Sequence, residues 1–257
     1  LASFDQSKIE RCTKTVTVLG CDGKEIGENR QANGVDYVCL GELHDYTSAA
    51  FVAVEDKRFY SHKGVDWIRV AGAIKNDLLS LSFREGASTI TQQLVKNTHL
   101  SNKKTVKRKI EEIRIARKIE RIYSKDEILE KYLNVVYFGN GIYGIEDAAE
   151  RYFGKSAANL SLAESAVLAG IINNPSGFNP ITNPEKALKR SRTVLNRMYE
   201  QGKIDKEQHE KATAHAPEFR ISQTKDNSFF KSVTAESEKI LSERNLRPDE
   251  YKIITFG

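Results

Sequence analysis

The sequence predicts a mainly α-helical protein with a short β segment at its N-terminus. Apolar residues recur at helical spacing over most of residues 47–211. Two Ser-x-x-Glu sequences, at Ser124 and Ser161, are typical of capping boxes that begin helices. The alternating β-formers of TVTVL and a following Asp-Gly turn signal indicate strand and turn within residues 1–45.

The elements follow in order along the chain. We expect helices in SAAFVAVEDKRFY, in VDWIRVAGAIKNDLLSLSF, in a segment that LVKNTHL closes, from about Lys104 to Tyr123, after Ser124, in LAESAVLAGII, and as a pair over residues 185–214 with Asp205 as a cap. The LAESAVLAGII helix should end before Asn174-Pro175, and Pro175, Pro180 and Pro184 should mark a loop. Further on, SFFKSVTAESEKILSERN can form an amphipathic helix, and YKIITF resembles the start of a strand.

Composition limits the class of protein without deciding its function. Charged residues make up 29% of the 257 residues and hydrophobic residues 39%, which is typical of a globular chain. The net charge of +5 fits nucleic acid, anionic lipid headgroups or a pyrophosphate as a partner. No apolar run is long enough to span a bilayer, and the start lacks a signal-peptide pattern.

Three cysteines, Cys12, Cys21 and Cys39, lie near the N-terminus. No Cys-x-x-Cys occurs, which argues against a zinc or redox motif. Cys12 and Cys21 could form a disulfide if the segment between them turns back on itself. We interpret all three as structural or incidental, and the redox compartment stays undetermined.

The first segment with chemical potential is VAVEDKRFYSHKGVD, which offers Glu55, Asp56, His62 and Gly64. A carboxylate beside apolar residues can have a raised pKa and act as a general base. A solvated acidic pair on a helix explains the same residues, and spacing alone favours that simpler interpretation.

A second segment, REGASTITQQLVKN, concentrates hydroxyls and amides between Gly86 and Asn97. Such a run can direct backbone N–H groups and amide donors at an anionic oxygen, and Lys96 adds a positive charge. No Gly-Lys-Ser/Thr follows, so it is not a phosphate-binding P-loop. A helix cap that leads into a polar helix is the alternative.

A third segment, KKTVKRKIEEIRIARKIER, is strongly basic. Arg108, Glu112, Ala116 and Glu120 share one helix face. A glutamate held among cations stays ionised and can position a metal or a pyrophosphate. The alternative is a solvated helix with ion pairs one turn apart.

The fourth segment, EILEKYLNVVYFGNGIYGIEDAAERYFGKSA, mixes aromatics with Gly139, Gly141 and Gly144, which predicts core packing and tight turns. Two Ser-x-x-Lys sequences lack the other motifs of penicilloyl-serine enzymes. The sequence also lacks an Asp-x-Asp metal site, a dinucleotide fingerprint and a His-Glu-x-x-His.

Taken in order, these segments and LSLAESAVLAGIINNPSGFNP resemble the five successive motifs of glycosyltransferase family 51 over about residues 45–200. This family comprises the peptidoglycan polymerases of class A penicillin-binding proteins and monofunctional transglycosylases. Five long motifs in one order make a chance match very improbable. One departure is Ala87, where the family usually has a second glycine.

The resemblance implies a lysozyme-like helical head with a smaller, membrane-facing jaw at about residues 67–85. It divides the chain into a β and linker segment (1–45), a glycosyltransferase domain (46–215) and a C-terminal connector (216–257). The connector's YKIITFG would match the strand that enters a transpeptidase domain. We therefore expect a chain trimmed of an N-terminal membrane helix and a C-terminal transpeptidase, with a short natural protein as the alternative.

The resemblance also implies the activity: polymerisation of lipid II onto a growing glycan chain at the extracytoplasmic face of the bacterial membrane. Glu55 would be the general base and Glu112 the second essential carboxylate. A divalent cation such as magnesium is expected and no nucleotide, and the partners would be lipid II and a membrane surface rather than nucleic acid. The inhibitor moenomycin, which mimics the donor, should bind. The residues implied to bind substrate or pyrophosphate are Ser88, Thr89, Gln92, Gln93, Lys96, Asn97, Arg108 and Lys109, with Asp56, Phe59, His62, Gly64 and Gly86 in support.

Two other functions compete with polymerisation. A lytic transglycosylase or lysozyme-like hydrolase would use a catalytic acid to cleave glycan, but cleavage has no pyrophosphate to bind. A non-catalytic module would hold nucleic acid or anionic membrane on the basic helix, with binding that weakens steeply in salt.

Overall fold

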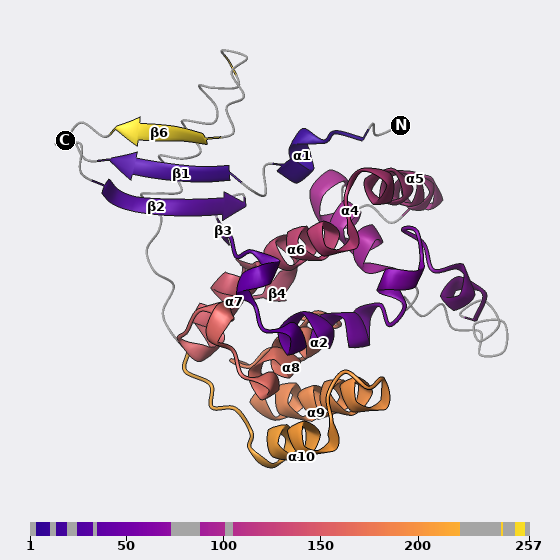
Figure 1. Cartoon of the computed structure of the whole chain (residues 1–257), viewed down its shortest axis with the longest axis vertical. Helices are drawn as coiled ribbons and strands as arrows, with labels where there is room; N and C mark the ends of the chain where they lie inside the picture. Colours follow the sequence, from indigo (N-terminus) through magenta and orange to yellow (C-terminus); the bar gives the residue numbers. More distant parts are fainter. Residues whose placement is uncertain are drawn as a thin grey trace.

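A computed structural model describes residues 4–10, 14–19, 25–32, 35–72, 88–100, 105–221, 243 and 250–254. Most of these residues are helical, which confirms the predicted fold class. Figure 1 shows a helical body with a small β-sheet beside it, and α9 and α10 at the end of the body remote from the sheet.

The helices account for most of the described chain. They are α1 (Ser7–Glu10), α2 (Asp45–Glu55), α4 (Ile90–His99), α5 (Val106–Ile122), α6 (Lys125–Val135), α7 (Ile145–Phe153), α8 (Leu162–Ile171), α9 (Pro184–Glu200) and α10 (Lys206–Ala214), with short 3₁₀ turns at Leu40–Glu42, Phe59–Ser61 and Ala157–Asn159. Residues 67–72 are also helical.

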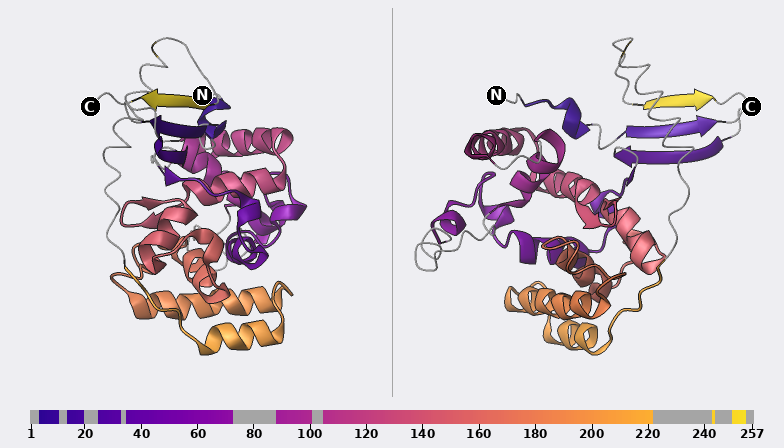
Figure 2. Two further views of the ribbon diagram at one scale, coloured as in Figure 1. Left: turned by 60° about the vertical axis from the view of Figure 1, so that its left-hand side comes forward. Right: turned by 180° about the vertical axis from the view of Figure 1, so that it is seen from behind.

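A four-stranded sheet joins segments from opposite ends of the chain. Its strands are β1 (Lys14–Leu19), β2 (Glu25–Ala32), β3 (Val35–Asp36) and β6 (Glu250–Ile254), in the order β3-β2-β1-β6. The β1–β2 and β2–β3 pairs are antiparallel, whereas β6 runs parallel to β1. Both strand predictions are confirmed, and Figure 2 shows the sheet from two further sides. The pairing of β6 with β1 had no local signal in the sequence.

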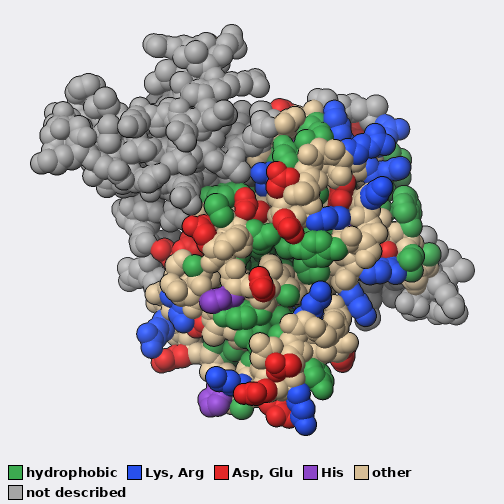
Figure 3. Space-filling view, in the orientation of Figure 1, with side chains coloured by type: hydrophobic (Ala, Val, Ile, Leu, Met, Phe, Trp, Pro, Cys, Tyr) green, Lys and Arg blue, Asp and Glu red, His purple; other side chains and the backbone are tan. Residues whose placement is uncertain are grey.

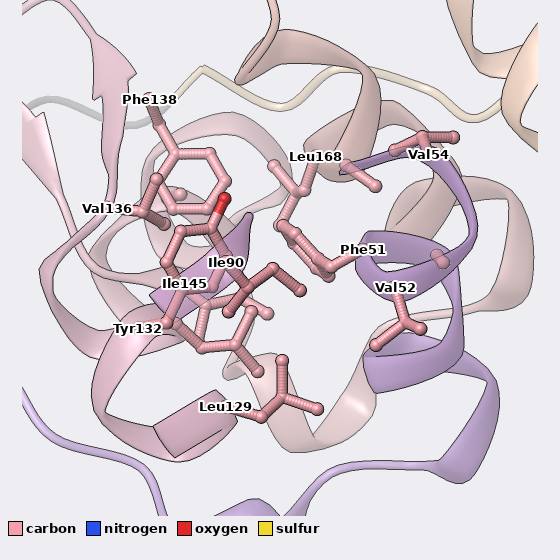
Figure 4. Packing of buried hydrophobic residues seen from close by; sticks show 14 of the residues in the cluster. Phe51, Val52, Val54, Ile90, Leu129, Tyr132, Val136, Phe138, Ile145 and Leu168 are labelled. Carbon is pink, nitrogen blue, oxygen red and sulfur yellow. The ribbon is translucent and has the colours of Figure 1, made fainter. Parts of the chain in front are cut away.

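The hydrophobic core lies where α2, α6, α7 and α8 meet. Phe51 of α2 and Phe138 pack edge to face with ring centroids 6.2 Å apart. Figure 4 shows these rings among buried side chains from α4, α6, α7 and α8. Inside this core the hydroxyls of Thr47 and Ser165 share a hydrogen bond of 2.9 Å, which ties α2 to α8. The central helix α2 is therefore held on several sides at once.

The predicted helix caps are confirmed. Ser124 and Glu127 form a capping box at the start of α6, and Ser161 and Glu164 form one at the start of α8. Asp205 caps α10 by accepting a hydrogen bond from the Gln208 N–H at 2.8 Å. Each pairing lies within one helical turn, so the local sequence suffices to specify it.

Two predictions were wrong in detail, and one element had not been predicted. The helix placed in SAAFVAVEDKRFY begins earlier, at Asp45, and ends at Glu55, because Asp56 leaves helical geometry at φ −154°. Pro184 is the first residue of α9 rather than part of the preceding loop, since proline fits the first helical position. The glycine-rich aromatic segment forms an antiparallel hairpin, β4 (Tyr137–Gly139) with β5 (Ile142–Tyr143), which had not been predicted.

Several predictions fall outside the described residues. They concern the jaw beyond residue 72, Gly86 and Ala87, the Asp22-Gly23 turn, the pairing of Cys12 with Cys21, and the helix in SFFKSVTAESEKILSERN. Within the described part of the chain, every helix is too short or too polar to cross a bilayer.

Candidate active site

Glu55 is the last residue of α2, and only 8% of its surface is exposed. The side-chain amide of Gln93 donates a hydrogen bond of 2.8 Å to Glu55 Oε2. Burial raises the pKa of Glu55, while the Gln93 hydrogen bond and the charges of Arg69 and Arg190 oppose that rise and Asp56 adds to it. The solvated acidic pair, which spacing alone favoured, is therefore wrong for Glu55, and the pKa direction agrees with the alternative of a carboxylate among apolar residues.

The backbone at the end of α2 is held by side chains from other elements. The last carbonyls of a helix have no partner within it. Here three of them accept N–H groups from remote residues: Ala53 O from Gln201 Nε2 at 3.0 Å, Val54 O from Arg197 Nη1 at 3.4 Å, and Glu55 O from Arg69 Nη1. The backbone that carries Glu55 is thus held by Arg197 of α9, by Gln201 directly after α9, and by Arg69 of the 67–72 helix.

Asp56 is fully buried and joins three segments. His62 Nε2 lies 3.0 and 2.9 Å from its two oxygens, and the Ile90 N–H donates to Oδ2 at 3.0 Å. Phe59, also fully buried, packs its ring edge against His62 with centroids 6.2 Å apart. Asp56 and His62 therefore fix the start of α4 relative to the end of α2.

Thr89 and Gln92 form the N-terminal cap of α4. The Thr89 N–H donates to Gln92 Oε1 at 3.0 Å, and the Gln92 N–H donates to Thr89 Oγ1 at 3.2 Å. The Thr89 hydroxyl also donates to Gly64 O at 2.7 Å. Both side chains are buried in these contacts, which places them in a helix cap, the alternative considered for this segment.

Gly64 lies against the backbone of α5. Its φ of +86° favours glycine, and a Cβ added there would stand 3.0 Å from the carbonyl carbon and oxygen of Ala116. This close approach sets the position of α5 relative to the loop that follows α2.

The cationic face of α5 surrounds a buried carboxylate. Glu112 is 3% exposed, Lys109 Nζ donates to its Oε1, and Arg108 Nη1 lies 3.8 Å from its Oε2. Lys109 Nζ also donates to Ser88 Oγ at 3.0 Å, which connects α5 to the residues before α4. The Nε and Nη1 of Arg108 are buried without a hydrogen-bond partner. A solvated row of ion pairs is therefore excluded for this face.

The remaining predicted residues lie on or beside α4. Lys96 and Asn97 are exposed on α4, which also carries Gln93. Figure 3 shows Lys and Arg side chains gathered at the upper right, over the region of α5.

Tyr132 of α6, which had not been predicted, donates from its hydroxyl to Gln93 Oε1 at 3.4 Å. A chain of hydrogen bonds thus runs from α6 through Gln93 to Glu55.

The donor set of the site fits an anion better than a resident metal. Among the described residues, no group of three or more His, Cys, Asp or Glu side chains is arranged to hold a metal ion. The carboxylate of Glu112 already faces two cations, which repel a third, and leaves Arg108 with free donors. Free donors on a buried guanidinium are suited to phosphate oxygens.

The sequence matches the transglycosylase family over residues 22–199. Penicillin-binding protein 1A/1B of Bacillus subtilis is 44% identical over 211 residues, which cover 82% of this chain and 23% of that protein. Penicillin-binding protein 1A of Neisseria lactamica is 43% identical over 215 residues, which cover 82% of this chain and 26% of that protein. Penicillin-binding protein 2D of Bacillus subtilis is 37% identical over 246 residues, which cover 94% of this chain and 36% of that protein.

A crystal structure of penicillin-binding protein 1A from Haemophilus influenzae is 24% identical to this chain, with a TM-score of 0.44. The match covers 95% of this chain and 26% of that protein. The chain thus spans about a quarter to a third of the length of these curated relatives.

The buried Glu55 is joined through α4 to the cations of α5, and the match over residues 22–199 identifies the protein as an enzyme of the glycosyl-transfer class. Because the family match covers more than half of its residues, the chain belongs to the transglycosylase family. Its helical body is a transglycosylase domain, similar in sequence to part of the penicillin-binding proteins named above.

Proposed function

We propose that this chain polymerises lipid II into β-1,4-linked glycan strands, with inversion at the anomeric carbon and release of undecaprenyl pyrophosphate. The observation that carries the proposal is the contact between Gln93 and the buried Glu55, because it brings the candidate base and the polar helix α4 together. The reaction would take place at the extracytoplasmic face of a bacterial membrane, where the lipid-linked substrates lie.

In the proposed step, Glu55 removes the proton from the 4-hydroxyl of the acceptor sugar. The oxygen attacks the anomeric carbon of the growing chain, and the bond from that carbon to the pyrophosphate oxygen breaks. The electron pair of this bond leaves with the pyrophosphate, and the proton stays on Glu55 until water takes it. A base with a raised pKa suits this role, because it takes up the proton more readily.

The leaving pyrophosphate needs positive charge, which we assign to Lys109 and Arg108. Lys109 is held between Ser88 and Glu112, so its ammonium group is fixed before substrate arrives. The buried, unpartnered nitrogens of Arg108 gain hydrogen bonds when phosphate oxygens enter. Glu112 would keep both cations in place, and Lys96 and Asn97 would contact the donor at the solvent side.

Magnesium, if it takes part, would be carried by the phosphates of the substrate, since Mg²⁺ commonly binds through substrate phosphates with one or two carboxylates. Glu112 already faces Lys109 and Arg108, so it would meet such a cation only after the substrate phosphates had offset their charge. A bound divalent cation would supply further charge neutralisation at the leaving group.

The test is polymerisation of labelled lipid II by the protein and by two variants. Glu55→Gln should abolish polymer formation while lipid II binding persists. Glu120→Gln is the matched control, because the Glu120 side chain is only 5% exposed but bonds to Thr91 and Lys125 instead, at 2.5 and 2.7 Å. Full activity of Glu55→Gln would remove Glu55 from the mechanism.

The same experiment separates the two competing functions. Incubation with preformed glycan would release fragments if the protein were a hydrolase or lytic transglycosylase. A binding module would retain lipid in both variants and form no polymer in any of them. Polymer from lipid II that depends on Glu55 fits neither alternative.

A further inference from the structure

Arg69 contacts Glu55, although Arg69 was not among the site residues predicted from the sequence. Its Nη1 donates to the backbone oxygen of Glu55, and its charge lies close enough to act on the Glu55 carboxylate. It extends from the 67–72 helix, whose residues Trp67 and Ile68 are 59% and 71% exposed. One side chain therefore joins an exposed apolar helix to the proposed base.

The helix that carries Arg69 begins at a fixed point. Asp66 is its N-cap residue, since its Oδ1 accepts from the Arg69 N–H at 3.0 Å. Arg58 holds Asp66 in turn, with Nε donating to Oδ2 at 3.0 Å and Nη2 to Oδ1. Partial burial raises the pKa of Asp66, but the hydrogen bonds from Arg58 and Arg69 outweigh it and hold the pKa below its usual value. Arg58 and Asp66 thus set the direction from which Arg69 reaches Glu55.

We propose that Arg69 is a positioning residue for Glu55: it fixes the backbone of the base and places a positive charge beside its carboxylate. The inference rests on the proposed function, in which Glu55 must be ionised to accept a proton. It goes beyond that function because Arg69 lies outside the five motifs and the position and ionisation of Glu55 depend on it.

Other groups facing Glu55 define what Arg69 contributes. Arg190 of α9 also acts on Glu55 with positive charge, but its guanidinium lies over the ring of Phe178 and its Nε has no hydrogen-bond partner. Asp56 acts with the opposite sign, and the buried Tyr132 hydroxyl contacts Gln93 rather than Glu55. Among these groups, Arg69 alone combines a positive charge at the carboxylate with a hydrogen bond to the backbone of the same residue.

The sign of the effect follows from these charges. The positive charge of Arg69 opposes the rise in the pKa of Glu55 that burial causes. Removing that charge should raise this pKa further, so a larger fraction of Glu55 would be protonated and inactive as a base at a given pH. Raising the pH should restore ionisation but not the lost hydrogen bond to the Glu55 backbone.

A substrate-free titration tests the charge effect directly. Infrared difference spectra between each protein and its Glu55→Gln counterpart isolate the carboxyl band of Glu55 as pH changes. Arg69→Gln should move the midpoint of this band upward by about one pH unit. Arg69→Lys should leave it near the wild-type midpoint, and the exposed Arg192→Gln on α9 should leave it unchanged as a control for net charge. An unchanged midpoint in Arg69→Gln would overturn the proposal.

Activity then tests the consequence for the reaction. In Arg69→Gln we expect a lower kcat that recovers partly at higher pH, with an unchanged KM for lipid II and partial rescue by Arg69→Lys. If kcat fell equally at every pH and in proportion to a fall in melting temperature, Arg69 would be merely structural and the proposal would be refuted. Because the titration uses no substrate, it stands even if the chain fails to polymerise lipid II, so the two failures are distinguishable.

Discussion

Gln93 donates its side-chain amide to Glu55 Oε2 across 2.8 Å, from a helix that begins 35 positions further along the chain. The oxygen of the same amide accepts from Tyr132. An amide so placed can only present its N–H group to Glu55, and it therefore favours the ionised carboxylate. The contact makes Gln93 the bridge between the proposed base and α4.

Glu55→Gln should give an inactive protein that is more stable than the wild type at neutral pH. The folded-state pKa of Glu55 is raised, so its contribution to stability is fully present below the unfolded pKa and is lost as pH rises through the folded pKa. Glutamine mimics the neutral form at every pH. Melting temperatures recorded from acidic to neutral pH should therefore coincide at the acidic end and diverge as pH rises. A variant less stable than wild type throughout would contradict the burial argument.

Gln93→Ala should shift the acid limb of the pH–rate profile to higher pH. The variant loses the hydrogen bond that favours ionised Glu55, and bonds to charged groups contribute roughly 1.5–3 kcal/mol, which predicts at least a tenfold lower rate near neutral pH. Gln201→Ala is the matched control, because that amide donates to the backbone at Ala53 and leaves the Glu55 carboxylate untouched. Identical profiles for the two variants would rule out a specific role for Gln93.

Lys109→Gln should weaken the binding of moenomycin by about tenfold or more, since one charge-assisted contact to phosphate is lost. Lys107→Gln, which removes an exposed charge from the same helix, should have little effect. Calorimetric titration of both variants measures the difference. Because Lys109 and Glu112 are in contact, the Lys109→Gln/Glu112→Gln double variant should lose less affinity than the two single losses added together. Equal weakening by Lys107→Gln and Lys109→Gln would indicate only a general charge effect.

Gly64→Ala should lower the free energy of unfolding by about 1–3 kcal/mol, because it adds a close contact with Ala116 to a strained φ. Gly141→Ala separates the two effects: its φ is also positive, at +76°, but a Cβ there would meet nothing within 4 Å. Urea denaturation should show the larger loss for Gly64→Ala. Equal losses would mean that the contact with α5 carries no cost.

Magnesium should bind weakly to the protein alone and more tightly in the presence of a pyrophosphate-bearing lipid. The reason is that Glu112 already faces the positive charges of Lys109 and Arg108. Phosphate groups must offset these charges before a magnesium ion can bind beside Glu112. Calorimetry with magnesium alone, and then with the lipid present, checks the order. Tight, stoichiometric binding to the protein alone would disprove the arrangement.

The sequence predicted those features whose partners lie close together in the chain. Ser124 with Glu127 and Ser161 with Glu164 sit within one helical turn, so their capping boxes could be read directly. The apolar residues that precede Glu55 on the same helix showed that a raised pKa was possible, but spacing alone favoured a solvated acidic pair. Motif order identified the family and its candidate carboxylates without any knowledge of distances.

Contacts between distant segments had no such signal. Arg69, Arg197 and Gln201 meet consecutive carbonyls at the end of α2, but nothing in their own neighbourhoods indicates this. The helical spacing of α5 placed Arg108 and Glu112 on one face but could not show that the face is buried against other elements. Pro184 was assigned to a loop because a proline both ends and begins helices, and only the geometry of the following turn decides between the two.

The parallel pairing of β6 with β1 sets an order for biosynthesis. Thr15 lies opposite Glu250, so the sheet acquires its fourth strand only after the helical body between these two residues has been synthesised. The helices rest mostly on contacts nearer in sequence, and such contacts form first because they require less loop closure. A nascent chain that ends before residue 250 should therefore already protect the helical body from protease while β1 still lacks its parallel neighbour.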